Sequence, residues 1–131
     1  MERIKDMSLV ELLNPKENEH ILDLGCEYGE KTKEIAQKSG ARVVGIDRDD
    51  LSYKWEEIRK GYGNLEFQVM DATNLKFNEE FDAVFSNLLI HHIKSPKQVI
   101  SSVWKALRPG GRFVAEFYGH GTAKEIILAL Q

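Results

Sequence analysis

The stretch ILDLGCEYG, residues 21–29, decides the fold of this 131-residue chain. The segment His20–Gly25 is typical of a buried strand that ends in glycine. Gly25 and Gly29 would let the backbone turn sharply after that strand and approach a ligand. A helix is expected next, over residues 30–38, because apolar residues lie there within a polar surround and a Ser-Gly pair follows. A strand, a glycine loop and a helix in this order predict a parallel sheet with helices on its faces.

The same alternation of strand and helix recurs along the rest of the chain. A short amphipathic piece, residues 8–14, precedes the first strand, and the Arg-Pro-Gly-Gly run at 108–111 predicts a turn into the last one. Such a series favours a doubly wound α/β sheet, in which ligands bind at the carboxyl ends of the strands. Strands are expected over residues 20–25, 41–47, 65–71, 81–87 and 112–117. Helices are expected over residues 30–38, from Asp49 or Asp50 through Leu51, Trp55 and Ile58, over 96–107 and over 122–130.

The composition excludes several classes of protein. Lys and Arg number 18 against 21 Asp and Glu, and this net charge of −3 disfavours general binding to nucleic acid or to an anionic membrane. The single cysteine, Cys26, excludes a disulfide framework and a cysteine-based zinc cluster, and no metal site is expected. No apolar run is long enough for a membrane span, and the N-terminus lacks the apolar region of a signal peptide. A cytoplasmic protein is the expectation.

Three consecutive strands end at an aspartate or within a residue or two of one: Asp23, Asp47 and Asp71. One such residue would commonly begin a turn or cap a helix. Three at the same edge of a parallel sheet favour a ligand site. Asp47 follows Asp23 by 24 residues, close to the spacing of roughly 20 at which an acidic side chain meets ribose hydroxyls in dinucleotide-binding folds.

The loop after the first strand is acidic, which bears on the ligand's charge. Three carboxylates, those of Asp23, Glu27 and Glu30, surround it, and Lys31 is the only nearby base. The loop is not G-x-G-x-x-G, because Glu27 stands where a nicotinamide or flavin enzyme needs glycine for the pyrophosphate. A pyrophosphate would be repelled here, whereas a ligand with a sulfonium and an ammonium group would be attracted. The electrostatics favour a cationic nucleoside over NAD or FAD.

Five motifs resemble, in order and spacing, those of class I S-adenosylmethionine-dependent methyltransferases. The resemblance runs from about residue 19 to 117, and the Leu-Arg-Pro-Gly-Gly turn before the fifth strand is among its more specific marks. Within the family, Ser86-Asn87 with the following His pair and the Ala-Glu-Phe ending of the fifth strand are similar to the small-molecule group that includes trans-aconitate methyltransferase-like proteins (methyltransferase type 11). The motifs are residues 21–29, Gly45–Asp47, Asp71-Ala72, Phe81–Asn87 and Ala106–Arg112.

The resemblance implies a fold and an activity. The fold is a single S-adenosylmethionine-binding domain over residues 1–131, with a Rossmann-like, mostly parallel sheet of five strands in the order 3-2-1-4-5. The activity is transfer of a methyl group from S-adenosylmethionine to a small-molecule acceptor, with S-adenosylhomocysteine as product. Neither nucleic acid nor a membrane is an expected partner.

The resemblance also implies roles for individual residues. Asp23 and the loop backbone would hold the methionine end, and Asp47 would accept hydrogen bonds from both ribose hydroxyls. Arg48 would lie along the adenine, Asp71 would accept from its amino group, and Asn87 would sit at the sulfonium end. The cofactor-binding residues implied are Asp23, Gly25, Cys26, Glu27, Gly29, Asp47, Arg48, Asp71, Ala72, Asn87 and Leu88.

The chain departs from the family pattern in two places. Glu27 stands where the family usually has glycine, so the glutamate fits only with a negative φ or with its side chain pointing away, and it is expected to limit cofactor affinity. The family's sheet has seven strands, and strands six and seven are expected to be absent here. Strand five, residues 112–117, would then be an apolar sheet edge. A twofold homodimer through strand five and the last helix is the expected consequence.

Two roles are open for His91 and His92, which follow the fourth strand. In the first role, the histidine makes a local hydrogen bond at the start of a helix. In the second, His91 or His92 acts as a general base for an acceptor hydroxyl or amine. Three functions are also open. The first is a small-molecule methyltransferase, the second is a module that binds the nucleoside without catalysis, and the third, less favoured by Glu27, is a nucleotide-dependent oxidoreductase.

Overall fold

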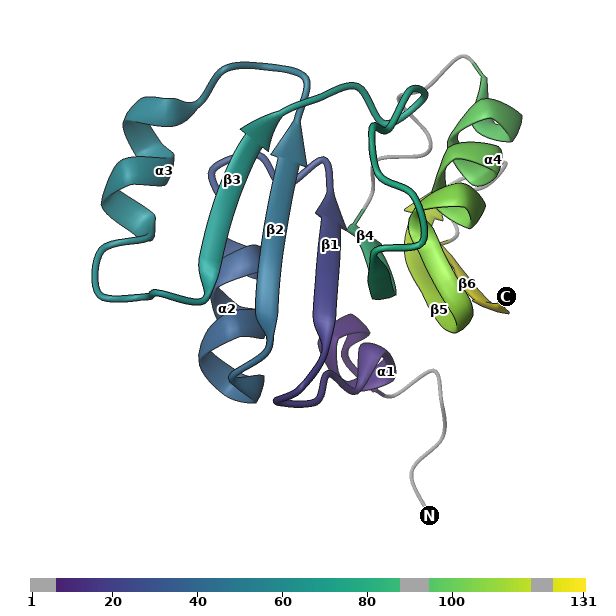
Figure 1. Ribbon diagram of the computed structural model, residues 1–131, viewed down its shortest axis with the longest axis horizontal. Helices are drawn as coiled ribbons and strands as arrows, with labels where there is room; N and C mark the ends of the chain where they lie inside the picture. The colour runs from purple at the N-terminus through teal and green to yellow at the C-terminus, as the bar shows by residue number, and fades with distance from the viewer. Residues whose placement is uncertain (1–6, 88–94, 119–123) are drawn as a thin grey trace.

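Strand β1 (His20–Leu24) lies between β2 (Arg42–Asp47) and β4 (Phe81–Asn87), and both run parallel to it (Figure 1). This computed structural model describes residues 7–87, 95–118 and 124–131. Beyond β2 lies β3 (Leu65–Val69), and beyond β4 lies β5 (Leu107–Tyr118), again parallel. The predicted doubly wound α/β sheet and the order 3-2-1-4-5 of its first five strands are confirmed.

Helices cover both faces of the sheet because the central strands are apolar on both sides. Along β1, Ile21 faces the side where α1 (Leu9–Leu13) and α2 (Glu30–Ser39) pack. Leu22 and Leu24 belong to the core on the opposite face, which α4 (Pro96–Ala106) covers. The short helix α3 (Ser52–Ile58) follows β2 and buries Trp55.

The tail differs from its predicted helix at 122–130. Residues Lys124–Leu130 form a sixth strand, β6, that runs antiparallel to β5 and gives the sheet order β3-β2-β1-β4-β5-β6. A short apolar run fits a helix or a strand equally well by its pattern, and here the unpaired edge of β5 decides. Ile127 and Ala129 pack against the core, whereas Ile126, Leu128 and Leu130 are exposed.

One further expectation is therefore wrong, and the basis of another is missing from the structure. The prediction that no strand follows the fifth is corrected by β6, which lies beside β5 at the edge of the sheet. The homodimer was expected through a free edge at strand five and an apolar last helix. The structure has neither feature, since β6 pairs along residues 112–118 and the tail is extended.

The predicted turn at 108–111 is present as an interruption within β5. Phe81 pairs with Leu107 and Ala83 with Arg112, so four residues of β5 stand opposite Asp82 alone. The backbone of Gln131 supports these four residues, because its N–H donates to the Gly111 carbonyl at 2.9 Å.

Polar groups at the amino ends of the strands satisfy one another. The guanidinium of Arg112 donates to the carbonyl oxygens of Leu13 and Asn14 at 2.8 and 3.2 Å and to both carboxylate oxygens of Glu19 at 2.6 and 2.8 Å. The hydrogen bond from Arg112 keeps the pKa of Glu19 below its usual value, although burial opposes it. Asp82 accepts from the His20 N–H at 2.8 Å and pairs with the exposed Arg108.

Within the described ranges, none of the helices combines the length and apolar character needed to cross a membrane.

Candidate functional site

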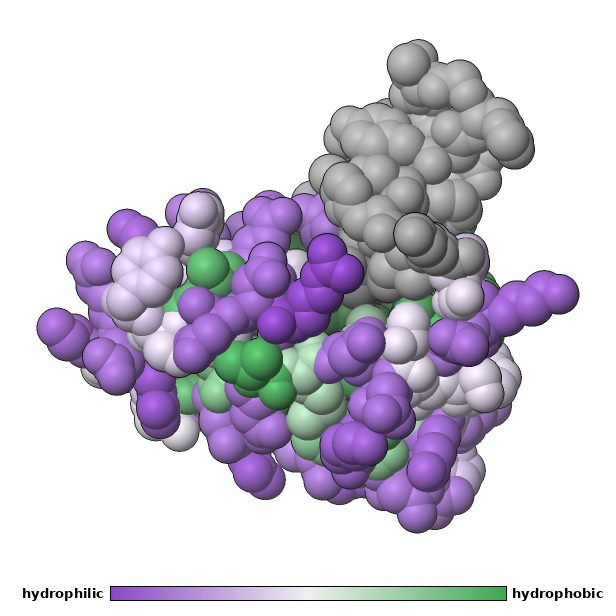
Figure 2. Space-filling view, turned by 90° about the horizontal axis from the view of Figure 1, so that it is seen from above, coloured by the Kyte–Doolittle hydropathy of each residue, from purple (hydrophilic) through white to green (hydrophobic). Residues whose placement is uncertain are grey.

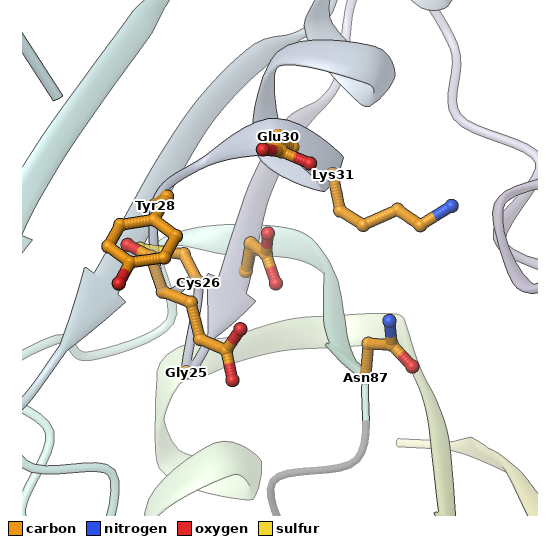
Figure 3. Close-up of a pocket in the computed structure, with 8 residues that line it drawn as sticks. Gly25, Cys26, Tyr28, Glu30, Lys31 and Asn87 are labelled. Atoms are coloured by element: carbon orange, nitrogen blue, oxygen red, sulfur yellow. The ribbon is translucent and has the colours of Figure 1, made fainter. Parts of the chain in front are cut away.

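A pocket of about 280 Å³ opens at the carboxyl ends of β1 and β4 (Figure 3). Asp23 of β1 and Asn87, the last residue of β4, line it from these two adjacent strands, and the loop after β1 and the first turn of α2 complete the wall. Seen from above, at the carboxyl ends of the first strands, the surface is largely hydrophilic (Figure 2). The lining residues are Asp23, Gly25, Cys26, Glu27, Tyr28, Glu30, Lys31 and Asn87.

The loop between β1 and α2 needs glycine at its end for a steric reason. Gly29 is the N-cap of α2 at φ +94°, and a Cβ built on it would meet the Phe67 ring at 2.6 Å. The same ring would meet a Cβ on Gly45 of β2 at 2.9 Å. Phe67 of β3 thus fills the space that two glycines leave, and it brings α2 close to the sheet.

Three hydrogen bonds to two elements, β2 and α3, fix the backbone of this loop. The Cys26 N–H donates to the Ile46 carbonyl at 2.8 Å, and the Glu27 N–H donates to Oδ2 of Asp47 at 2.9 Å. On the other side, the Trp55 indole N–H of α3 donates to the Glu27 carbonyl at 2.7 Å. The loop is thereby attached to the end of β2 and to α3.

Asp47 keeps capacity for a ligand although it supports the loop. Its Oδ2 accepts from Glu27, and its Oδ1 accepts from the Asp49 N–H at 3.0 Å. A carboxylate offers about four acceptor sites, so two remain for hydroxyl donors. The carbonyl of Asp47 also accepts from the Met70 N–H at 2.9 Å, which ties the ends of β2 and β3 together.

Glu27 adopts a left-handed backbone, contrary to one expectation from the sequence. Its φ is +51°, so of the two conditions under which a glutamate was expected to fit, a negative φ or a side chain that points away, the first is not met. Its side chain is exposed at the pocket wall. A residue with a Cβ loses roughly 1–2 kcal/mol in this conformation relative to a right-handed one. The bonds from Glu27 to Asp47 and from Trp55 hold it there.

Asp23 is the most deeply buried acidic group of the pocket, with 2% of its surface exposed. Burial raises its pKa to about 7, a hydrogen bond from the Thr32 hydroxyl at 2.8 Å opposes the rise, and the charges of Asp47 and Glu27 add to it. A cation in the pocket would favour the ionised form. Burial also raises the pKa of the Cys26 thiol, which disfavours the thiolate and suits this buried cysteine to packing.

Comparison with known proteins identifies the family. The sequence profile of a family described as a methyltransferase domain matches residues 22–115. The chain belongs to this methyltransferase domain family. That family uses S-adenosylmethionine, and the fold and the acidic pocket agree with a cofactor that carries a sulfonium.

Two curated relatives of the methyltransferase domain match most of this chain. An uncharacterized methyltransferase of Schizosaccharomyces pombe is 35% identical over 91% of this chain and 47% of its own length. An O-methyltransferase of Penicillium expansum is 31% identical over 78% of this chain and 39% of its own length. The chain thus spans less than half of the length of these relatives.

A solved structure shares both fold and sequence with the domain. Phosphoethanolamine N-methyltransferase 2 of Haemonchus contortus, in complex with phosphomonomethylethanolamine and S-adenosylhomocysteine, superposes with a TM-score of 0.79. It is 31% identical, and the match covers 89% of this chain and 29% of that one.

The structure gathers only part of the predicted site residues of the methyltransferase domain in the pocket. Asp23, Gly25, Cys26, Glu27 and Asn87 line it, and Gly29 and Asp47 support the loop that forms its wall. Three others, Arg48, Asp71 and Ala72, lie near the ends of β2 and β3. The predicted Leu88, His91 and His92 lie outside the described residues.

Asp71 closes its own turn and remains ionised. Its Oδ1 accepts from the Thr73 N–H at 2.9 Å and from the Thr73 hydroxyl at 2.8 Å. These bonds, with a smaller effect of the Arg48 charge, lower the pKa of Asp71. The next residue, Ala72, is buried against the core.

Sequence reasoning missed two kinds of residue in the methyltransferase domain. Tyr28, Glu30 and Lys31 line the pocket but were absent from the implied set of cofactor-binding residues, although Glu30 and Lys31 had been placed beside the glycine loop by their charge. Thr32 and Trp55 support the site by hydrogen bonds, and nothing in the sequence marked them, since Trp55 was expected only as part of the helix after the second strand.

Proposed function

We propose that the chain is a single cofactor-binding domain that transfers a methyl group from S-adenosylmethionine to a small-molecule acceptor. The observation that carries this proposal is the pocket at the carboxyl ends of β1 and β4, with Asp23, Glu27 and Glu30 on its wall and Asp47 holding its loop. Three carboxylates against one lysine attract a ligand of net positive charge.

The residues fit the parts of this cofactor. Asp47 would accept from the ribose hydroxyls through the acceptor sites that Glu27 and Asp49 leave free. Asp71 would accept from the adenine amine through Oδ2, with Arg48 and Ala72 beside it. At the other end, Asp23 and Asn87 would face the methionine part, and Lys31 would face its carboxylate. Gly25, Cys26, Glu27 and Gly29 would form the wall between, with Leu88 following Asn87.

The bound cofactor supplies an electrophilic methyl group on a positively charged sulfur. Binding in one orientation aligns that group with the acceptor, and alignment alone contributes much of the rate in such transfers. The acceptor oxygen or nitrogen forms the new bond to carbon and gives up a proton, while the carbon–sulfur electrons stay on sulfur. His91 or His92 is proposed to take that proton.

A small-molecule acceptor is supported by the names of the relatives. Phosphoethanolamine N-methyltransferases of Caenorhabditis elegans and Haemonchus contortus match the chain over 84% and 89% of its length. A nicotinamide enzyme is less well supported, because the acidic wall would repel a pyrophosphate.

Calorimetric titration of Asp47→Asn with S-adenosylhomocysteine tests the proposal. The variant keeps the size of the side chain but replaces one acceptor oxygen by a donor, so binding should weaken by about 1–3 kcal/mol. Asp50→Asn is the matched control, because Asp50 is an exposed carboxylate in the same loop that accepts from Ser52. Wild-type affinity in Asp47→Asn would contradict the ribose assignment.

Two further measurements separate the alternative functions. Titration of the wild-type chain with NAD should give no binding at concentrations that saturate with S-adenosylhomocysteine. Methyl transfer to phosphoethanolamine and to small hydroxylated acceptors distinguishes a catalyst from a module that only binds the nucleoside. Loss of transfer without loss of cofactor affinity in His91→Ala or His92→Ala would identify the base.

A further inference from the structure

Glu27 occupies a position that the scaffold shapes for glycine. Its φ of +51° is fixed from outside, because its N–H donates to Asp47 and its carbonyl accepts from the Trp55 indole. A glycine would take the same backbone conformation without strain. The loop geometry therefore does not require a side chain here, and the glutamate must be explained by what its carboxylate does.

The carboxylate of Glu27 is not used by the fold. The side chain is exposed on the pocket wall beside Asp23 and Glu30, and none of the hydrogen bonds or ion pairs found among the described residues involves its oxygens. Its charge nevertheless reaches into the pocket: after burial, which is the main cause, the charges of Asp47 and Glu27 raise the pKa of Asp23. A charge that the protein leaves without a partner at a pocket wall is available to a cationic ligand.

We infer that Glu27 makes this pocket distinguish the charged cofactor from the neutral product, and so favours replacement of S-adenosylhomocysteine by S-adenosylmethionine. The inference rests on the proposed function. Methyl transfer converts the sulfonium, which has a positive charge, into a neutral thioether, while the other groups of the molecule keep their charges. A nearby carboxylate therefore stabilises the complex before transfer and does little for the complex after it.

The test measures a ratio of affinities and does not depend on activity. Dissociation constants for S-adenosylmethionine, S-adenosylhomocysteine and sinefungin, which carries an ammonium group in place of the methylsulfonium, are obtained by calorimetry for the wild type, Glu27→Gln and Glu27→Gly. We expect the preference for the two cationic ligands over S-adenosylhomocysteine to fall by a factor of about ten in both variants, equivalent to about 1.4 kcal/mol. In the wild type the preference should shrink as salt is added, because exposed charges are screened.

Glu56→Gln is the matched control, since it removes an exposed carboxylate from α3, outside the pocket lining. Its ligand preference should equal that of the wild type. Glu27→Gly also guards against misfolding, because it relieves the left-handed strain that Glu27→Gln keeps.

The outcomes distinguish failure of the Glu27 inference from failure of the proposed function. If both ligands bind the wild type and the preference is unchanged in Glu27→Gln and Glu27→Gly, the inference is overturned and the proposed function stands. If neither ligand binds the wild-type chain, the proposed function fails and the inference fails with it. A shift of equal size in Glu56→Gln would also overturn the inference, because net charge alone would then explain it.

Discussion

The two ends of the sheet use the same kinds of side chain in opposite ways. At the amino ends, Arg112 donates to two carbonyls and to both oxygens of Glu19, and Asp82 accepts from the backbone of His20. At the carboxyl ends, Asp23 has one hydrogen bond, from Thr32, and the Glu27 carboxylate has none among the described residues. Polar groups that satisfy one another stabilise the fold, whereas groups held without partners are available to a ligand.

The largest expected effect is at the amino ends. Arg112→Met should lower the free energy of unfolding by about 3 kcal/mol, because Glu19 is left partly buried without its partner and two carbonyls lose their donor. Urea denaturation measures this loss. Affinity for S-adenosylhomocysteine should change less than about twofold, since the pocket lies at the other end of the strands.

Arg42→Met is the control for that prediction, because Arg42 lies at the same end of the sheet and is exposed. This substitution should lower the free energy of unfolding by less than about 0.5 kcal/mol. Equal losses in the two variants would mean that the Arg112 contacts contribute nothing beyond an ordinary surface arginine.

A smaller change in the free energy of unfolding, of about 2 kcal/mol, is expected from the titration of Asp23. Its pKa is about 7 in the folded chain and about 3.9 when unfolded, so the folded state binds more protons between these values. The stability that Asp23 contributes is fully present below about pH 4 and is lost as pH rises through 7. From pH 5.5 to 7.5, without ligand, the wild type should lose about 2 kcal/mol that Asp23→Asn does not lose.

Urea denaturation at these two pH values measures the difference. The range avoids Glu19, whose lowered pKa has the opposite sign: its contribution is present above the usual value of 4.5 and is lost on acidification through the lower folded value. Parallel stability curves for the wild type and Asp23→Asn would show that Asp23 is ionised in the folded chain throughout this range.

The smallest expected effect is at Arg108. Its ion pair with Asp82 at 3.1 Å has side chains 48% and 28% exposed, so Arg108→Met should cost less than about 1 kcal/mol. Asp82 keeps its hydrogen bond from the His20 N–H in this variant. A loss above about 2 kcal/mol in the same urea assay would show that this end of the sheet depends on Arg108 as well as on Arg112.

The comparison also explains how much could be predicted from the sequence. The strands and the aspartates at their ends were predictable, because apolar runs, glycines and Asp23, Asp47 and Asp71 follow local rules. The tail at 124–130 was not, because its apolar pattern fits both a helix and a strand, and the choice depends on the edge that β5 presents.

Contacts between distant residues were equally out of reach. Arg112 contacts Glu19 across 93 residues, and Trp55 contacts the Glu27 carbonyl across 28. Neither pair has a signature in local pattern. For the same reason the positive φ of Glu27 was not foreseen, since it is imposed by those long-range bonds and costs the residue conformational energy.

The contact of Trp55 with the glycine loop has a consequence for motion. Trp55 stacks on Phe67 with ring centroids 5.3 Å apart, and Phe67 in turn occupies the space beside Gly29 and Gly45. The seven-residue helix α3 carries Trp55 and has no side-chain cap at its N-terminus. Any local opening that lifts α3 from the sheet breaks the bond to the Glu27 carbonyl and leaves the loop held only by its two hydrogen bonds to β2. The stability of a short helix therefore contributes to the rigidity of the loop that forms the pocket wall.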